Sequence, residues 1–194
     1  KIHTELEIKQ TDLICEPKID GLAVNLLYQD GQFIQAATRG DGQIGEDVTS
    51  NVRTIRELPL SIATKESITI RGEIYIQKDE LIRINHERTN LGLEIYMNPR
   101  NLAAGTVRQL DPRIAAQRKL KLFTYQIINH ASNNNLRTTH MDNLNRLREL
   151  SFPVNSLIKN VDSIKSTIEY CKNLELIRGD LDYEIDGAVI KINS

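Results

Sequence analysis

The stretch LICEPKIDGLAVNLLYQDGQF, residues 13–33, contains two apolar runs that are each followed by an Asp-Gly pair. Aliphatic and β-branched residues dominate both runs, which is typical of buried strands. Asp-Gly favours a tight turn because both residues tolerate positive φ. We therefore predict strands over 13–19 and 22–28, a break at Asp20-Gly21, and a hairpin turn at 30–31 that leads into QFIQAATR.

Lys18 lies between two carboxylates, Glu16 and Asp20, at alternate positions along this stretch. Alternate side chains of a strand share a face, so the three charges should point the same way. The pattern fits either a solvated charged face on an edge strand or a reactive amine with acidic supports. A lysine nucleophile must be a neutral amine, which neighbouring carboxylates disfavour. The acids suit a nucleophile if they hold a hydrated Mg²⁺ or a substrate hydroxyl.

Further strands and helices follow without a regular strand–helix–strand alternation. SITIRGEIYI, residues 67–76, is rich in β-branched residues and predicts a strand, and the apolar spacing of 79–91 predicts a helix. The other predicted elements are a loop over 40–47, helices over 47–55, 101–110, 139–150 and 162–177, strands over 120–128 and 183–193, and a surface loop over 130–136. This order predicts an α+β fold of largely antiparallel sheets with flanking helices, in one domain.

The composition is that of an ordinary soluble globular domain, with 40% hydrophobic and 26% charged residues among 194. No apolar run approaches the roughly 18 residues that a membrane helix needs. Cys15 and Cys171 have no metal or redox spacing, so we expect both to be buried and the compartment to be a reducing cytoplasm. The histidines at 3, 86, 130 and 140 show no pairing typical of a metal site, and no role is assigned to them.

Charge is distributed unevenly along the chain. The formal net charge of −1 argues against a uniformly basic nucleic-acid binder. Residues 98–121, however, carry six basic side chains and one acidic one. Such a stretch is either a solvated face or a surface that holds phosphates.

Gly40, Gly42 and Gly45 match the pattern G-x-G-x-x-G, and Glu66 follows about 20 residues later. A dinucleotide-binding fold would need a strand–helix crossover here. The preceding strand is instead the second arm of the predicted hairpin, and the helix that follows is short and polar, so this interpretation is rejected. A glycine-rich loop beside a phosphate remains open.

EPKIDG resembles the K-x-D-G motif of the covalent nucleotidyltransferases, which are DNA and RNA ligases and messenger-RNA capping enzymes. Four further segments resemble the bacterial NAD-dependent DNA ligase family in order and approximate spacing: ATRGDGQIGEDVTSNVRTI, IRGEIYI, NPRNLAAGTVRQLDP and YEIDGAVIKIN. ATP-dependent relatives share the first and last motifs but not RGDGQIGED or NPRNLAAG. The resemblance covers nearly the whole chain and implies a nucleotidyltransferase (ATP-grasp-like) ligase core.

The resemblance implies a covalent mechanism centred on Lys18. This residue would attack the adenylyl phosphorus of NAD, release nicotinamide mononucleotide and carry AMP, which then passes to the 5′-phosphate of nicked DNA before the nick is sealed. Asp20 would orient Lys18 and the hydrated Mg²⁺, and Glu16 would meet the adenine edge. Arg39 would contact the nucleotide, and Glu73 would bind the ribose hydroxyl and support the metal.

Five later positions complete the site that the resemblance implies. Arg100 and Arg108 would contact phosphates of the cofactor or of the nicked strand. Asp186 and Lys191 match the later motif, in which the lysine lies against the adenylate. Arg178 matches a further arginine of the family by its spacing alone. No position is assigned as a direct metal ligand; Asp20, Glu73 and Asp186 would reach the metal through its waters. In a strand that begins near 183, Glu184 and Asp186 would share a face, and we expect a nucleotide between residues 13–39 and 183–193.

The family also has parts that this sequence does not resemble. They are an N-terminal segment that grips the nicotinamide half, a later lysine motif and further modules, one of which binds zinc. We therefore expect residues 1–194 to be an adenylation core that is truncated at both ends. By itself this core should not be adenylated on Lys18 from NAD at a useful rate. Its expected setting is the bacterial cytoplasm, with nicked double-stranded DNA as partner and no membrane or obligate protein partner. The alternatives are an ATP-dependent ligase or capping-type core, and a non-catalytic nucleic-acid-binding module.

Overall fold

Two antiparallel sheets form the frame of the computed structural model, which describes residues 12–39, 45–129 and 139–193. The strands are β1 (Leu13–Ile19), β2 (Leu22–Gln29), β3 (Gln32–Thr38), β4 (Ile68–Tyr75), β5 (Lys121–Asn129), β6 (Lys159–Val161) and β7 (Ile185–Ile192). The helices are α2 (Thr49–Val52), α3 (Lys78–Asn90), α4 (Pro99–Val107), α5 (Pro112–Gln117), α6 (His140–Glu149) and α7 (Ile164–Ile177). The predicted α+β class, with antiparallel sheets and flanking helices, is confirmed.

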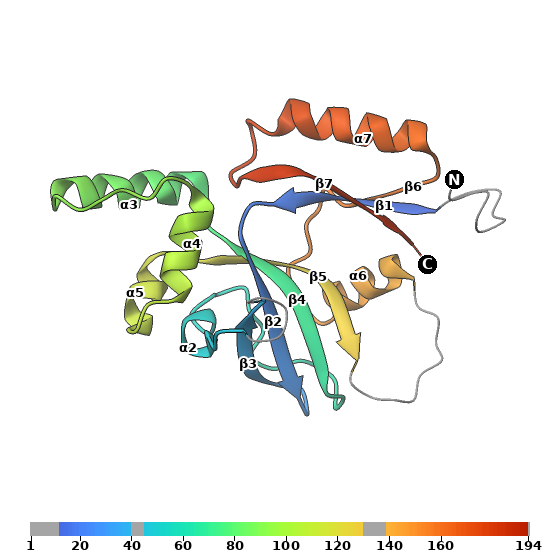
Figure 1. Cartoon of the computed structure of the whole chain (residues 1–194). Coiled ribbons are helices and arrows are strands. Elements are labelled where there is room, and N and C mark those ends of the chain that lie inside the picture. The colour runs from blue at the N-terminus through green and yellow to red at the C-terminus, as the bar shows by residue number, and fades with distance from the viewer. Residues whose placement is uncertain (1–11, 40–44, 130–138, 194) are drawn as a thin grey trace.

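The break predicted at Asp20-Gly21 is the point where the chain passes from one sheet to the other. β1 lies in a three-stranded sheet of order β6-β1-β7, and β2 lies in a four-stranded sheet of order β3-β2-β4-β5 (Figure 1). A Cβ atom on Gly21 would come within 2.3 Å of the carbonyl oxygen of Ile74, so β4 passes too close for any other residue. The second Asp-Gly pair forms the predicted hairpin turn, with φ of 49° at Asp30 and 76° at Gly31.

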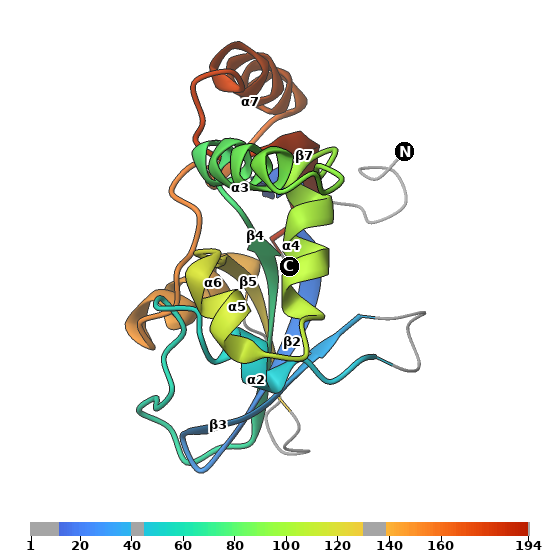
Figure 2. The same cartoon turned by 90° about the vertical axis from the view of Figure 1, so that its left-hand side faces the viewer.

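One face of the four-stranded sheet is covered by helices. Apolar residues of β2 and β4 share a buried cluster with residues of α2, α4, α5 and α6. In Figure 2, α4 runs beside β2, and α7 lies at the far end of the molecule, over the other sheet. A second cluster joins α7 to β1 and β7 through Cys15, Tyr170, Leu174 and Ile185. The opposite face of the four-stranded sheet carries more polar and exposed residues, among them Asn25, Arg71 and Glu73.

Several details differ from the expectations. The helix predicted over 47–55 is shorter in the structure. It consists of α2 alone, because the chain forms turns after Val52 instead of a further helical turn. Sequence reasoning missed α5 and the short strand β6, which has few residues and pairs only with β1. Cys15 is buried as expected, but Cys171 is exposed because it lies on the outer side of α7. The predicted loop over 130–136 and most of the glycine loop lie outside the described residues.

Candidate active site

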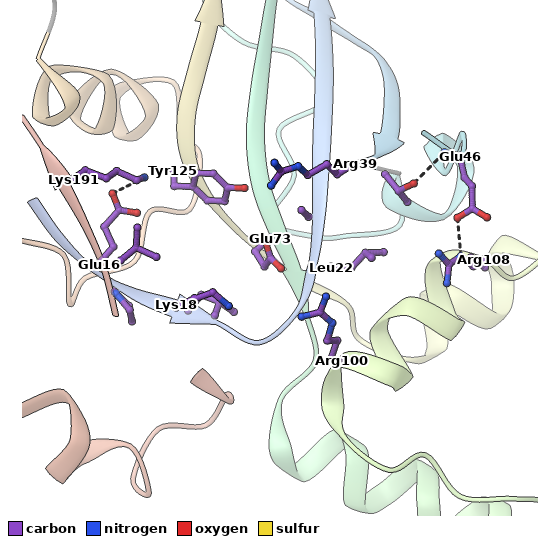
Figure 3. Close-up of a pocket in the computed structure, with 15 residues that line it drawn as sticks. Glu16, Lys18, Leu22, Arg39, Glu46, Glu73, Arg100, Arg108, Tyr125 and Lys191 are labelled. Carbon is purple, nitrogen blue, oxygen red and sulfur yellow. Dashed lines mark hydrogen bonds and ion pairs between the residues drawn. The ribbon is translucent and has the colours of Figure 1, made fainter. Parts of the chain in front are cut away.

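A cavity of about 730 Å³ opens between the two sheets, where β1 and β7 face the uncovered side of β2, β4 and β5 (Figure 3). Its walls include the two chain regions between which we expected a nucleotide, residues 13–39 and 183–193. The lining contains four residues from these regions that the sequence had singled out, Glu16, Lys18, Arg39 and Lys191. It also contains Glu73, Arg100 and Arg108 from β4 and α4 and its C-cap.

Lys18 is held by a carboxylate of the neighbouring strand. Its Nζ lies 2.8 Å from Oδ1 and 2.6 Å from Oδ2 of Asp186. The pairing of β1 with β7 is irregular after Lys18, which leaves Asp186 as an extra residue opposite the lysine. The side chain of Lys18 is 51% exposed, so it remains open to the cavity. Glu184 precedes β7 and lies 3.9 Å from Lys78, so the expected acidic pair contributes only Asp186 to the lysine.

Asp20 does not line the cavity, but it approaches Arg100, which does. The Oδ1 atom of Asp20 lies 3.6 Å from Nη1 of Arg100, which belongs to the first turn of α4. Asn98 caps this helix by accepting a hydrogen bond from the backbone of Asn101, and Pro99 fits the first turn. The cap therefore determines where the chain places Arg100.

Glu73 faces the cavity from β4, and burial raises its pKa to about 7. The positive charges of Arg100 and Lys18 oppose this shift, and the nearby carboxylates of Asp186 and Asp20 add to it. No hydrogen bond from another described residue satisfies the Glu73 carboxyl group. A carboxyl group with a raised pKa in a cavity is suited to contact a ligand hydroxyl or the water shell of a cation.

Glu16 is almost fully buried, with 7% of its side chain exposed, yet it is surrounded by donors. Lys191 Nζ lies 2.9 Å from Oε1 of Glu16, and Nε2 of His140 contacts the same oxygen. Burial would raise the pKa of Glu16, but the contacts of His140 and Lys191 outweigh it and lower the pKa. Lys191 Nζ also lies 5.2 Å from the ring centroid of Tyr125, which lines the cavity.

Sequence reasoning missed His140 and Tyr125. His140 was given no role because it has no metal-site spacing. In the structure it contacts Glu16, which lies 124 positions away in the chain. Tyr125 lies in an apolar strand, where an aromatic residue is ordinary core material. The only local signal is Thr139, whose capping box starts α6 and so positions the histidine that follows.

Arg108 is also positioned by residues that are distant in sequence. Its Nε donates to Oε2 of Glu46 at 2.7 Å, and both residues line the cavity (Figure 3). Buried Asn51 donates to the carbonyl oxygens of Val107 and Gln109, at 2.7 Å in each case. Asn51 thus holds the backbone of the residues that precede and follow Arg108.

A known protein family and its relatives match the whole length of the chain. A family model described as the NAD-dependent DNA ligase adenylation domain matches residues 1–194. The chain belongs to this family. The DNA ligase of Acholeplasma laidlawii is 47% identical over 96% of the chain, and that of Bacillus mycoides is 42% identical over 100%. The adenylation domain spans 28% and 29%, respectively, of the length of these relatives.

Solved structures show the same fold at low sequence identity. A mycobacterial DNA ligase D complexed with ATP and MES has a TM-score of 0.55 and 16% identity, covering 94% of the adenylation domain and 49% of that chain. A putative ATP-dependent DNA ligase from Aquifex aeolicus has a TM-score of 0.52 and 12% identity, covering 100% and 44%. These likenesses support the nucleotidyltransferase ligase fold.

One predicted cofactor-binding residue of the adenylation domain, Arg178, lies away from the cavity. Arg178 is exposed at the end of α7 and lies outside the cavity lining, and its carbonyl oxygen accepts a hydrogen bond from Lys78. Within the described ranges, no group of three or more histidine, cysteine or acidic residues could hold a metal ion directly. Likewise, no helix in that part of the chain is long and apolar enough to cross a membrane.

Proposed function

We propose that the adenylation domain forms a covalent lysyl-AMP on Lys18 from NAD, as part of an NAD-dependent DNA ligase. The observation that carries this proposal is the position of Lys18, which lines the cavity near acidic side chains and near arginines. The carboxylate of Asp186 contacts the amine, and the charges of Lys18, Asp186 and Asp20 all act on the carboxyl group of Glu73. Arg39, Arg100 and Arg108 line the same cavity and supply the positive charge that a transferring phosphoryl group needs.

In the proposed first step, Nζ of Lys18 attacks the adenylyl phosphorus. A P–N bond forms, the P–O bond to nicotinamide mononucleotide breaks, and that group leaves with its phosphate. Attack requires a lone pair on Nζ, so the ammonium must lose a proton. Asp186 holds both oxygens within hydrogen-bond distance of Nζ and is the nearest acceptor for it. The AMP then passes to the 5′-phosphate of nicked DNA, and the adjacent 3′-hydroxyl displaces it.

Each wall of the cavity suits one part of the nucleotide. Glu16, Lys191 and Tyr125 form an end with a hydrogen-bond acceptor, a cation and an aromatic face, which suits adenine. Glu73 lies between this end and Arg100 and suits a ribose hydroxyl (Figure 3). The exposed guanidinium groups of Arg100 and Arg108 suit phosphates of the cofactor or of the nicked strand.

One acid of the cavity lining, Glu73, and two acids outside the lining, Asp20 and Asp186, also fit a hydrated Mg²⁺. Asp20, Glu73 and Asp186 offer carboxylate oxygens, the ligand type that this ion prefers, and Mg²⁺ commonly keeps several of its waters. When bound, the ion would supply positive charge beside the phosphate and favour the neutral amine. A ligase of this kind would act in the bacterial cytoplasm during DNA replication and repair, with nicked duplex as its partner.

The test of this proposal compares two nucleotide donors. A ligase that carries this adenylation domain, at the length of its curated relatives, is incubated with Mg²⁺ and either NAD or ATP, and its intact mass is measured. We expect one added adenylyl group from NAD and none from ATP. Labelling from ATP alone would favour the ATP-dependent alternative, and no labelling from either donor would favour the non-catalytic module.

Replacing Arg100 or Arg108 with alanine in that ligase should lower nick sealing about tenfold or more while changing stability little. Charge-assisted hydrogen bonds to phosphate are lost, whereas the side chains are 53% and 51% exposed and contribute little to the core. Sealing of a nicked duplex and the melting temperature are measured together. Arg113→Ala is the matched control, because Arg113 is 89% exposed and lies outside the cavity lining. A large drop in melting temperature with normal sealing would make the two arginines structural.

A further inference from the structure

His140 approaches Glu16 from outside the cavity. It is the first residue of α6, is absent from the cavity lining, and has 12% of its side chain exposed. The start of α6 is anchored at two points. Thr139 closes a capping box with Asp142, and the backbone N–H of Met141 donates to Oδ1 of Asn193 at 2.8 Å, just after β7. The imidazole is therefore held by the fold and does not depend on a ligand.

The hydrogen bonds at Glu16 are distributed unequally between its two oxygens. Nε2 of His140 and Nζ of Lys191 both contact Oε1, and the two nitrogens lie 3.3 Å apart. Because a carboxylate only accepts hydrogen bonds, Nε2 must carry a proton. Among the described residues, none donates to Oε2. Figure 3 shows one oxygen of Glu16 joined to Lys191 and the other turned away from it.

Of the two donors to Oε1 of Glu16, Lys191 is the one whose contact a bound nucleotide can change. It lines the cavity, and the proposed function requires it to lie against the adenylate. His140 does not line the cavity, so its contact with Oε1 remains when a nucleotide enters. A buried carboxyl group held at one oxygen keeps the direction of the other.

We propose that His140 is a positioning residue that holds Oε1 of Glu16 so that Oε2 accepts a hydrogen bond from the 6-amino group of a purine. This inference rests on the proposed function, because it requires adenine at this end of the cavity. The site then distinguishes a 6-amino purine from one without that donor, since an unpaired buried carboxylate oxygen is unfavourable.

The test measures the binding of two ligands to the 194-residue chain by calorimetry. One is AMP, and the other is purine riboside 5′-monophosphate, which carries hydrogen in place of the 6-amino group. The wild-type chain should bind AMP more tightly than the analogue. His140→Ala should weaken AMP binding about tenfold and change analogue binding less than about twofold. His140→Gln should restore most of the AMP affinity, because its amide nitrogen also donates a hydrogen bond.

The ratio of the two affinities separates positioning from general damage. A misfolded fraction lowers the number of binding sites for both ligands equally and leaves their ratio unchanged. Equal losses for both ligands in His140→Ala, or no loss for either, would overturn the inference. Failure of His140→Gln to recover AMP binding would do the same. If the wild-type chain binds neither ligand, the inference is overturned, whereas the proposed function is decided separately by adenylation of the longer ligase.

Discussion

Replacing Lys18 with alanine should abolish formation of the adenylyl-enzyme and leave the fold intact. The expected loss is complete because, among the described residues, the cavity lining offers no other lysine that is free to attack. Lys191, the other lysine of the cavity lining, is engaged with the carboxylate of Glu16, whereas Lys18 Nζ is held at Asp186. The loss of the Lys18–Asp186 ion pair should cost about 1 kcal/mol or less, since the two side chains are 51% and 41% exposed.

The measurement is the intact mass of the ligase after incubation with NAD and Mg²⁺, together with its melting temperature. Lys78→Ala is a suitable control, because Lys78 also lies near an acid, Glu184, but is outside the cavity lining. It should be labelled like the wild type. Stoichiometric adenylation of the Lys18→Ala variant would remove the nucleophile from the proposal.

Replacing Glu73 with glutamine should stabilise the fold at pH 8 by about 2 to 3 kcal/mol relative to its effect at pH 5. Burial raises the pKa of Glu73 from 4.5 to about 7, so an ionised carboxylate is unfavourable in the empty cavity. Between these values the folded chain binds more protons at this residue than the unfolded chain does. Its free energy of unfolding therefore falls as the pH rises through this range, and glutamine, which cannot ionise, removes the loss.

Urea unfolding of both proteins at pH 5 and pH 8, without nucleotide or metal, gives the difference directly. Glu66→Gln is the control, because Glu66 is exposed and lies outside the active-site cavity. A pH-independent effect of Glu73→Gln would show that the folded structure does not raise the pKa of Glu73, contrary to the expectation.

The Glu73→Gln substitution should raise the stability of the fold and lower the activity of the ligase together. A carboxyl group whose charge is unfavourable in the cavity is stabilised by contact with a ligand. The proposed ligands are a ribose hydroxyl and hydrated Mg²⁺. Active sites commonly hold such groups at a cost to stability. The Glu73→Gln ligase should therefore seal nicks more slowly while it melts at a higher temperature at pH 8.

Most elements of the fold could be predicted from local patterns. The strands β1, β2, β4, β5 and β7 were predicted from apolar content and β-branched residues, and the hairpin from Asp30-Gly31. Sequence reasoning failed where an element is short or where its stability comes from its neighbours. β6 has three residues and pairs with β1, and Cys171 was expected inside because burial was judged from residue type alone.

The sequence by itself determined the strand–break–strand unit around Lys18, because alternation and turn preference act between neighbours in the chain. The family resemblance likewise named residues that the cavity brings together, from Glu16 to Lys191. Only the tertiary structure decided their partners. Asp186 meets Lys18 across 168 residues because β1 and β7 pair with a one-residue irregularity. His140 meets Glu16 because α6 packs at the end of β7, and no local pattern encodes a contact that depends on how separate elements pack.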